Sequence, residues 1–503
     1  MDVLRGFALL CILIVNWTTD TKWDNDAWEG FSGVADQAVW WTINILLNEK
    51  SRPMFTFLFG LGFALQMERA DARGASFVAV YARRLAVLFL IGAAHDILTE
   101  RDILWEYALF GFVLLPLRRL NPALLVVLAL GIVLIPPLST APRYRDFVTR
   151  LTASNNARTE IKLDTPVLDT YLGEYELESE PYTIFVTRDG NALLVQSPGV
   201  PGGDDVPMRL VAESATQFFS RSVDAAQLSF TMASTGSVSA VVLHLGGRDV
   251  PGRVIHRGRP TTDDQALRRV ASQDPHYRIY ATGTFGQIVS MRARLVWQHI
   301  SSYATNWQVW LSSDFALFLL GLYAGRRRLF HEVDKHRELF RGVMWCGLAI
   351  GLLGDAFVTL IRDSPPGAAY RGEPLAFTSW ALTLPAAVLA APMLGLAYVA
   401  ALTLLLQQDA WKRRLSPFGN VGRMALTNYL LQSVAFVVLF FGYGLGWFGR
   451  VGPFNQMMLA LPVFAMQIVV SQWWLRRFKF GPAEWIWRTL TYWKLQPMRI
   501  DGL

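Results

Sequence analysis

The chain has 503 residues, of which 52% are hydrophobic and only 17% charged, and its formal net charge is +7. Average soluble proteins carry about 25% charged residues, so this composition cannot supply the surfaces of the roughly three soluble domains expected for such a length. It excludes an ordinary soluble enzyme and a disordered chain, and two cysteines exclude a disulfide scaffold. We therefore expect a polytopic α-helical membrane protein.

Apolar stretches of a length that suits a bilayer recur on both sides of a long polar gap. The first is expected to be an uncleaved anchor, because no small-residue cleavage site follows it. The shorter run Ala38–Leu47 is either an interfacial helix or the start of the second span. We expect about ten spans: Val3–Trp17, Pro53–Met67, Leu85–Leu98, Ile103–Leu117, Ala123–Leu138, Val309–Ala324, Val343–Ile361, Ser379–Leu406, Met424–Phe441 and Met457–Trp474.

The positive charges predict the orientation, because short cytoplasmic loops are enriched in Lys and Arg. With ten spans the basic clusters and both termini share one side, whereas the acidic stretches Asp20–Asp36 and Asp363–Glu373 and the loop Asp96–Asp102 share the other. This scheme predicts a multi-pass protein of a bacterial cytoplasmic (inner) membrane, with cytoplasmic termini and residues 139–305 outside. The clusters are interpreted as topology determinants; alternatively, some also hold a cytosolic anion such as the phosphates of a coenzyme. They are Arg69/Arg73/Arg83/Arg84, Arg118/Arg119, Arg326/Arg327/Arg328, Lys412/Arg413/Arg414 and Arg476/Arg477/Lys479.

The polar gap predicts an inserted extracytoplasmic domain over residues 141–285, between membrane segments at 1–140 and 286–503. Short alternating segments and a hairpin turn at Arg188–Asn191 indicate a small antiparallel β-barrel or sandwich at about 168–255. His244 and His256 are interpreted as residues on strand faces, because nothing near them has the spacing of metal ligands. The expected strands are Tyr171–Leu177, Thr183–Thr187, Ala192–Gln196, Gln217–Ser222, Leu228–Met232 and Ala240–Leu245.

Part of this insertion is similar to a known small domain. Leu168–Leu177 and Leu243–Ile255 resemble the β-domain that is appended to many β-lactamase-like proteins, domain-of-unknown-function family 3471. The resemblance implies a barrel-shaped fold with no generally assigned role. The segment has no Ser-x-x-Lys motif, so it offers no hydrolase chemistry of that kind.

Polar groups collect at the outer ends of the predicted spans, where burial is costly and function is the first hypothesis. His95 lies near the end of the third span and Asp102 opens the fourth, so the short connection lets the two side chains meet. An imidazole exchanges a proton near neutral pH, and an adjacent carboxylate would fix its tautomer. The alternative is structural: His95 ends one helix and Asp102 caps the next. Candidate substrate-binding residues at the same depth are Asn16, Lys50, Arg52, Asp314 and Asp355.

A polar stripe lies in the inner half of the ninth predicted span. Asn428, Gln432 and Ser433 fall at helical spacing beside Tyr429, and Arg423 is close by. The stripe either lines a path for an acyl donor, which makes Asn428, Tyr429, Gln432 and Arg423 candidate cofactor-binding residues, or supplies hydrogen bonds between helices.

Longer motifs resemble the YeiB-like family of membrane proteins, which is defined by domain of unknown function 418. They occur in both membrane halves. In the amino-terminal half they are Asp2–Leu9, Val15-Asn16, Phe57–Phe63, Gly92-x-x-His95, Asp102–Leu104 and Tyr107-Ala108; in the carboxy-terminal half they are Gly422–Ser433, Gly442–Gly446 and Phe480–Trp487.

The resemblance implies a relationship to the transmembrane acyltransferases, which carry an acyl group from a cytosolic thioester, usually acetyl-CoA, to an acceptor across the membrane. It implies His95 as general base oriented by Asp102, with acetyl-CoA or another acyl-CoA as donor and no metal. For the developing oxyanion, Asn16, Lys50 and Arg52 are equal candidates. The expected partners are membrane lipids and an extracytoplasmic glycan, lipid-linked sugar or small metabolite, with no nucleic acid; a homo-oligomer stays open.

Two other classes of function remain open. One is a proton-coupled transporter or lipid translocase in which His95, Asp102, Asp314 and Asp355 relay protons. Against it, no inverted repeat relates the two halves of the sequence. The other is a membrane tether that presents the β-domain to a partner without chemistry of its own.

Overall fold

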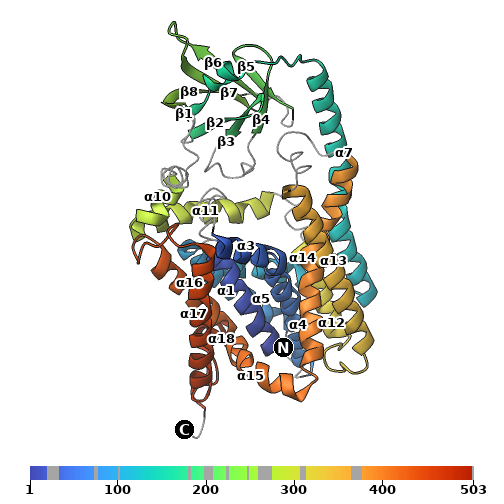
Figure 1. Cartoon of the computed structure of the whole chain (residues 1–503). Coiled ribbons are helices and arrows are strands. Elements are labelled where there is room, and N and C mark those ends of the chain that lie inside the picture. The colour runs from blue at the N-terminus through green and yellow to red at the C-terminus, as the bar shows by residue number, and fades with distance from the viewer. Residues whose placement is uncertain are drawn as a thin grey trace.

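The computed structural model describes residues 1–19, 33–72, 77–99, 102–178, 183–196, 208–221, 226–245, 248–258, 275–305, 313–363 and 377–500. A bundle of helices carries a β-barrel at one end, and two helices, α10 (Pro275–Thr282) and α11 (Phe285–Thr305), lie between barrel and bundle (Figure 1). We call the end of the bundle next to the barrel the barrel end, and the opposite end the far end.

The amino-terminal half forms α1 (Asp2–Thr19), α3 (Val34–Leu46), α4 (Ser51–Asp71), α5 (Phe77–Leu98), α6 (Leu104–Leu117) and α7 (Pro122–Asn156). The apolar run Ala38–Leu47 lies in α3 except for Leu47, which caps its end, and α3 is separate from α4 because the chain turns at Glu49 with φ +59°. Helix α7 has 35 residues and continues through the expected domain boundary at residue 140. It leads from the bundle toward the barrel (Figure 1).

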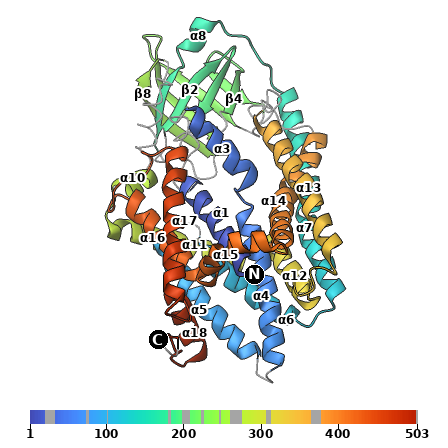
Figure 2. The same cartoon turned by 60° about the horizontal axis from the view of Figure 1, so that its bottom comes forward.

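The carboxy-terminal half forms α12 (Ser313–Arg326), α13 (Arg337–Asp363), α14 (Phe377–Leu405), α15 (Asp409–Arg423), α16 (Ala425–Phe440), α17 (Pro453–Leu475) and α18 (Pro482–Tyr492). Helices α15 and α16 meet at a bend of 79°. In Figure 2, α15 crosses the bundle while α17 runs along one side of it. The bend leaves the first backbone amides of α16 without partners in α15, and Glu484 of α18 accepts hydrogen bonds from the amides of Leu426 and Thr427 instead.

The apolar helices fit a membrane protein. Among the described residues, four helices are long and apolar enough to cross a bilayer: Phe77–Leu98, Arg337–Phe357, Val388–Leu405 and Pro453–Leu475. The bent pair α15 and α16 makes a fifth if it counts as one span, and Leu104–Leu117 and Pro122–Ile135 are apolar but shorter. Ten spans and the orientation stay predictions. Residues 20–32, 100–101 and 364–373 of the acidic segments, and residues 309–312 of the sixth predicted span, lie outside the described residues.

Helix α1 lies inside the bundle, in contact with α4, α15, α16 and α17. Two close crossings depend on glycine. A Cβ on Gly6 would collide with the carbonyl of Phe418 in α15, and a Cβ on Gly60 of α4 would collide with the carbonyl of Phe318 in α12. Small residues of this kind let membrane helices approach closely.

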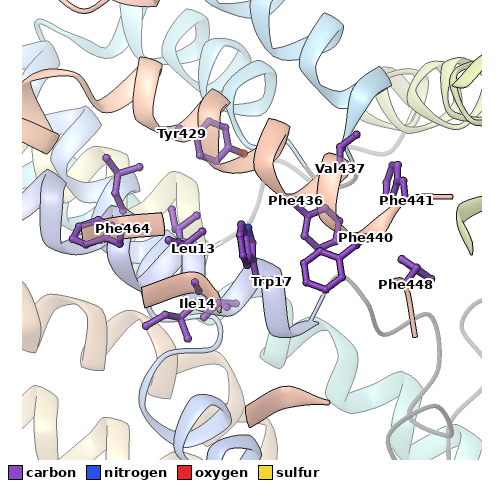
Figure 3. Close-up of a cluster of buried hydrophobic side chains, with 14 of the residues drawn as sticks. Leu13, Ile14, Trp17, Tyr429, Phe436, Val437, Phe440, Phe441, Phe448 and Phe464 are labelled. Carbon is purple, nitrogen blue, oxygen red and sulfur yellow. The ribbon is translucent and has the colours of Figure 1, made fainter. Parts of the chain in front are cut away.

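The apolar core at the barrel end is rich in aromatic rings. Trp17 of α1 is fully buried, and its ring contacts Phe436 and Phe440 of α16 at centroid distances of 6.4 and 5.7 Å. Figure 3 shows these rings with Leu13 of α1 and with Tyr429 farther along α16. Edge and tilted ring contacts of this kind favour a fixed geometry between two helices. The packing therefore positions Tyr429 relative to α1.

The insertion is a closed antiparallel barrel in which each strand pairs with its sequence neighbours and β1 pairs with β8. The strands are β1 (Gly173–Leu177), β2 (Thr183–Asp189), β3 (Ala192–Gln196), β4 (Met208–Ala212), β5 (Gln217–Ser220), β6 (Gln227–Met232), β7 (Val238–Leu245) and β8 (Arg248–Arg257). The expected barrel and its Gly190 turn, with φ +59°, are confirmed, and β4 and β8 were missed. Buried side chains such as Tyr175, Phe218 and Phe230 form the barrel's core.

Candidate functional site

His95 and Asp102 meet at the barrel end of the bundle. His95 Nδ1 lies 2.9 Å from Asp102 Oδ1, and their side chains are 6% and 0% exposed. Because an ionised carboxylate only accepts hydrogen bonds, Nδ1 carries the proton in this contact and Nε2 is left as the basic nitrogen. Burial raises the pKa of the Asp102 carboxyl above its ordinary value, and the hydrogen bonds from His95 and Tyr429 oppose that rise. The pair therefore has the arrangement of a base and its orienting acid.

Asp102 also holds the start of α6. Its Oδ2 accepts hydrogen bonds from the backbone amides of Leu104 at 3.0 Å and Trp105 at 3.4 Å. The structural alternative from the sequence is thus present together with the His95 contact, one on each carboxylate oxygen. Gly92 of α5 makes this approach feasible, since a Cβ there would lie 2.6 Å from Asp102 Oδ2 and 2.9 Å from Leu104 Cβ.

Arg292 of α11 fastens the connection between α5 and α6. Its guanidinium donates to the carbonyls of Asp96 at 2.7 Å and Thr99 at 2.6 Å, and it lies 3.1 Å from Asp96 Oδ1. Asp96 in turn accepts from the Trp105 indole at 3.1 Å. Arg292 is 3% exposed, so this ion pair is screened little by solvent. A cation from the segment that follows the barrel therefore fixes the loop that carries Asp102.

A small pocket, which we call the outer pocket, opens beside His95. It has a volume of about 370 Å³, part of it open to the outside, and its lining includes Asn16, Trp17, Thr99, Tyr429 and Phe436. Thr99 Oγ1 lies 3.3 Å from His95 Nε2, so the basic nitrogen is next to this pocket. Of the candidate oxyanion donors, Asn16 lines the outer pocket.

A larger cavity, the inner cavity, extends from the far end toward the same site. Its volume is about 1240 Å³, part of it open to the outside. One part of its wall carries Arg5, Arg84, Arg423, Arg488 and Glu484, and another carries Ile103, Leu104 and Tyr429. Between them lie Leu9, Ile12, Phe55, Leu58, Phe59 and Leu88.

The arginines of the inner cavity are largely uncompensated. Among the described residues, no carboxylate forms an ion pair with Arg84, Arg423 or Arg488. Arg84 lies over the Trp487 ring at 3.7 Å, and Arg488 lies over the Phe480 ring at 4.3 Å, which holds both guanidinium groups in place. Glu484, whose pKa is raised by burial, accepts from the amides of Leu426 and Thr427 at the bend. This end of the cavity can therefore bind an anion.

The other outer cations of the sequence lie apart from His95. Lys50 Nζ pairs with Asp355 Oδ2 at 3.0 Å, and Arg52 Nε pairs with Asp314 Oδ2 at 2.6 Å. Arg52 also pairs with Glu106, whose Oε1 lies 4.0 Å from His299 Nε2. Because carboxylates of other helices already hold both cations, neither lines the outer pocket as an oxyanion donor would.

The polar stripe of α16 divides into two parts. Asn428 Nδ2 donates to Ser471 Oγ at 3.0 Å, and Gln432 Nε2 donates to Gln467 Oε1 at 2.9 Å, so both residues connect α16 with α17. Tyr429 and Arg423 line the inner cavity instead. Interhelical hydrogen bonding therefore accounts for Asn428 and Gln432, whereas a role of Tyr429 and Arg423 in a donor path stays a prediction.

The barrel has its own histidine contact. His244 Nδ1 lies 2.6 Å from Asp249 Oδ1, and His244 Nε2 lies 3.0 Å from Ser229 Oγ. The order of groups resembles a catalytic triad, but the Asp249 side chain is 73% exposed. Ser229 lies in β6 between β5 and β7, so its backbone is paired within the sheet and does not offer an oxyanion hole. We therefore interpret these residues as a polar patch on the barrel wall. Within the described ranges, no three His, Cys, Asp or Glu side chains gather as metal ligands would.

Sequence reasoning did not find Thr99, Arg292, Arg488 or Glu484. Arg292 looks like any cation of an amphipathic helix, and its neighbour Arg294 is exposed. Arg84 was noticed only as part of a basic cluster. Glu484 lies within the motif Phe480–Trp487, which was the one available hint of its importance.

Comparisons with known proteins give a family model for part of the chain and several uncharacterised relatives. Residues 324–494 match the family model described as "Protein of unknown function (DUF418)". The uncharacterised protein YxaH of Bacillus subtilis (strain 168) is 27% identical over 511 residues, which cover 99% of this chain and 95% of YxaH. The uncharacterised protein YeiB of Escherichia coli (strain K12) is 48% identical over 71 residues, 14% of this chain and 18% of YeiB.

A third relative matches about a third of the chain. An uncharacterised 39.9 kDa protein in the amylase 3′ region of Bacillus acidopullulyticus is 33% identical over 183 residues, 35% of this chain and 51% of that protein. No solved structure matches the chain. The resemblance found in the sequence motifs is confirmed: residues 324–494 match the DUF418 family model, and the similarity to YxaH and YeiB supports a YeiB-like DUF418 protein.

Proposed function

We propose that this chain is an integral membrane acyltransferase. It moves an acyl group from a cytosolic CoA thioester, acetyl-CoA or another acyl-CoA, to a glycan, lipid-linked sugar or small molecule on the barrel side. The observation that carries the proposal is the inner cavity, which begins among arginines at the far end and reaches Tyr429 beside the His95–Asp102 pair. From Arg84 to His95 the donor would follow eleven residues of α5, about 16 Å at 1.5 Å per residue.

The groups in the site suffice for the transfer. His95 Nε2 takes the proton of the acceptor's O–H or N–H as that atom attacks the thioester carbonyl. The carbon–sulfur bond then breaks, and the imidazolium returns its proton to the leaving sulfur, so the products are the acylated acceptor and CoA thiol. Asp102 keeps the imidazole in the required tautomer and stabilises its charge. Asn16, which lines the outer pocket, is the candidate donor to the developing oxyanion.

The first experiment measures donor chemistry without knowledge of the acceptor. Purified protein in lipid vesicles is incubated with acetyl-CoA or octanoyl-CoA and an extract of bacterial envelope glycans and lipids, and release of CoA thiol is followed. His95→Ala should slow release by about 10²–10⁴-fold, the usual contribution of general acid–base catalysis. His244→Ala, which removes the other histidine bonded to an aspartate, is the matched control and should leave the rate unchanged.

The second experiment measures binding. Isothermal titration with CoA should show affinity that falls at least tenfold in Arg84→Ala and Arg488→Ala and is unchanged in Arg413→Ala, an exposed arginine of α15 outside the cavity. Release of CoA at the parental rate by folded His95→Ala would refute the proposed base. Absence of binding at millimolar CoA would refute the proposed donor.

A proton-coupled transporter or lipid translocase is the second candidate, and one observation favours it. The pair Lys50–Asp355 and the group Arg52, Asp314 and Glu106 join α4 to α13, α12 and α6, where they would lie within the membrane. Ion pairs between membrane helices occur along proton pathways. Proton uptake into vesicles that is lost in Asp355→Asn, together with absent CoA binding, is the result this candidate predicts. A tether for the β-domain predicts neither activity.

A further inference from the structure

Tyr429 stands between the outer pocket and the inner cavity. It belongs to the lining of both, and of the described residues it is the only one shared by the two linings. It lies in α16, just beyond the 79° bend. In Figure 3 Tyr429 lies in α16 apart from the cluster of Trp17, Phe436 and Phe440. Its side chain therefore separates a space entered from the far end from a space beside His95.

The same side chain contacts both members of the proposed catalytic pair. Its hydroxyl donates to Asp102 Oδ1 at 3.1 Å, the oxygen that also accepts from His95 Nδ1. Its ring centroid lies 5.1 Å from that of His95. The hydroxyl and the imidazole thus compete for the charge of one carboxylate oxygen.

We propose that Tyr429 is a movable partition and a positioning residue: when its side chain swings away from Asp102, the two cavities join and His95 becomes the sole donor to Asp102 Oδ1. A donor chain that enters among the arginines then reaches His95 Nε2 only as Tyr429 moves. The same movement concentrates the carboxylate charge on the imidazole and makes it a stronger base. The identity of the donor rests on the proposed acyl transfer, whereas the partition itself does not.

The partition can be tested by chemical access rather than by turnover. In a Cys11→Ala, Cys346→Ser background, Thr99→Cys puts a thiol on the wall of the outer pocket, on the side of Tyr429 away from the arginines. Vesicles of known orientation are treated with a small, charged, membrane-impermeant thiol reagent from either side. The thiol should react from the barrel side and only slowly from the far end.

Three variants decide the outcome. Tyr429→Ala should increase labelling from the far end at least tenfold, because removal of the ring joins the cavities. Tyr429→Phe keeps the ring but loses the hydrogen bond to Asp102 that holds it in place, so its labelling from the far end should lie between that of the parent and that of Tyr429→Ala. Leu431→Ala, two residues away and 48% exposed, is the matched control for loss of a large side chain from α16 and should label as slowly as the parent. Fast labelling of the parent from the far end, or unchanged far-end labelling of Tyr429→Ala while its thiol reacts from the barrel side, would overturn the partition.

The positioning role has a separate readout. Tyr429→Phe leaves Asp102 Oδ1 to His95 alone, so the pH profile of CoA release should move to higher pH, and the profile of Leu431→Ala, a residue in neither cavity lining, should stay in place. A merely structural contact would lower the rate without moving the profile. If labelling behaves as expected but no thioester is consumed by any variant, the partition stands and only the acyl-transfer proposal fails.

Discussion

Gly92 gives a direct test of how the site is built. The variant Gly92→Ala adds one methyl group where α5 meets the start of α6. That carbon would lie 2.6 Å from Asp102 Oδ2, 2.9 Å from Leu104 Cβ and closer still to the backbone nitrogen of Trp105. The Trp105 nitrogen belongs to the backbone, and hydrogen bonds to His95 and to α6 hold the Asp102 carboxylate, so the start of α6 must shift. The contact between Asp102 and His95 should shift with it.

The expected magnitude is a balance of three terms. Overpacking typically costs about 1–3 kcal/mol, and loss of the bonds from Asp102 to the first amides of α6 adds about 1 kcal/mol. Against this, alanine is favoured over glycine in a helix by up to about 1 kcal/mol. We therefore expect Gly92→Ala to lower the free energy of unfolding by about 1–3 kcal/mol.

Gly131→Ala is the matched control. A Cβ at Gly131, inside α7, meets only Ile135 Cδ1, at 4.0 Å. The same substitution should therefore stabilise the protein there by up to about 1 kcal/mol. The assay is thermal unfolding in detergent, followed by tryptophan fluorescence, to which the fully buried Trp105 contributes. If Gly92→Ala were as stable as Gly131→Ala, the close approach of α5 and α6 would be refuted.

Two further predictions concern charged groups near the site. Arg292→Gln should destabilise the protein by about 3–5 kcal/mol, because it leaves Asp96 buried without its cation. Arg294→Gln, at an exposed position, should change stability by less than about 0.5 kcal/mol. Equal midpoints of the two variants in thermal unfolding would contradict the role of Arg292. Burial raises the pKa of Glu484 above its ordinary value of 4.5, so the folded protein holds this proton more tightly than the unfolded chain does. The resulting stabilisation is fully present below pH 4.5 and is lost as pH rises through the folded-state pKa. Glu484→Gln removes this titration, so its unfolding midpoint relative to the parent should rise as pH rises above 4.5; a constant difference would contradict it.

The barrel shows which local features a sequence reveals. Six strands could be predicted because apolar and polar residues alternate along them and turn residues separate them. Strand β8 could not, because Pro251 and Gly252 are residues that normally argue against a strand. It forms nonetheless, because the closing barrel offers partners on both sides: β8 pairs with β7 and β1, and the carbonyl of Pro251 accepts from the amide of Glu178. Tertiary pairing overrides local preference there.

The site shows the limit of sequence spacing. His95 and Asp102 could be paired because seven residues and one turn separate them. The partners of Lys50 and Arg52 could not be predicted from spacing, because residues two positions apart at the start of a helix point in different directions and meet different helices. The arginines of the inner cavity come from α1, α5, α15 and α18. Their charges can be counted in the sequence, but only packing brings them around one cavity.

The insertion and the site are linked by the helix that leaves the barrel. Helix α11 follows the last strand after α10 and supplies Arg292, which holds the end of α5 through two carbonyls and a carboxylate. Arg292 of α11 therefore links the insertion to the site. A relative without α11 would need another cation beside Asp96 to hold the connection that leads to Asp102. Because the link acts on the same connection that Gly92 and Asp102 hold from inside the bundle, a ligand or partner of the barrel that displaces α11 would also disturb the geometry of His95.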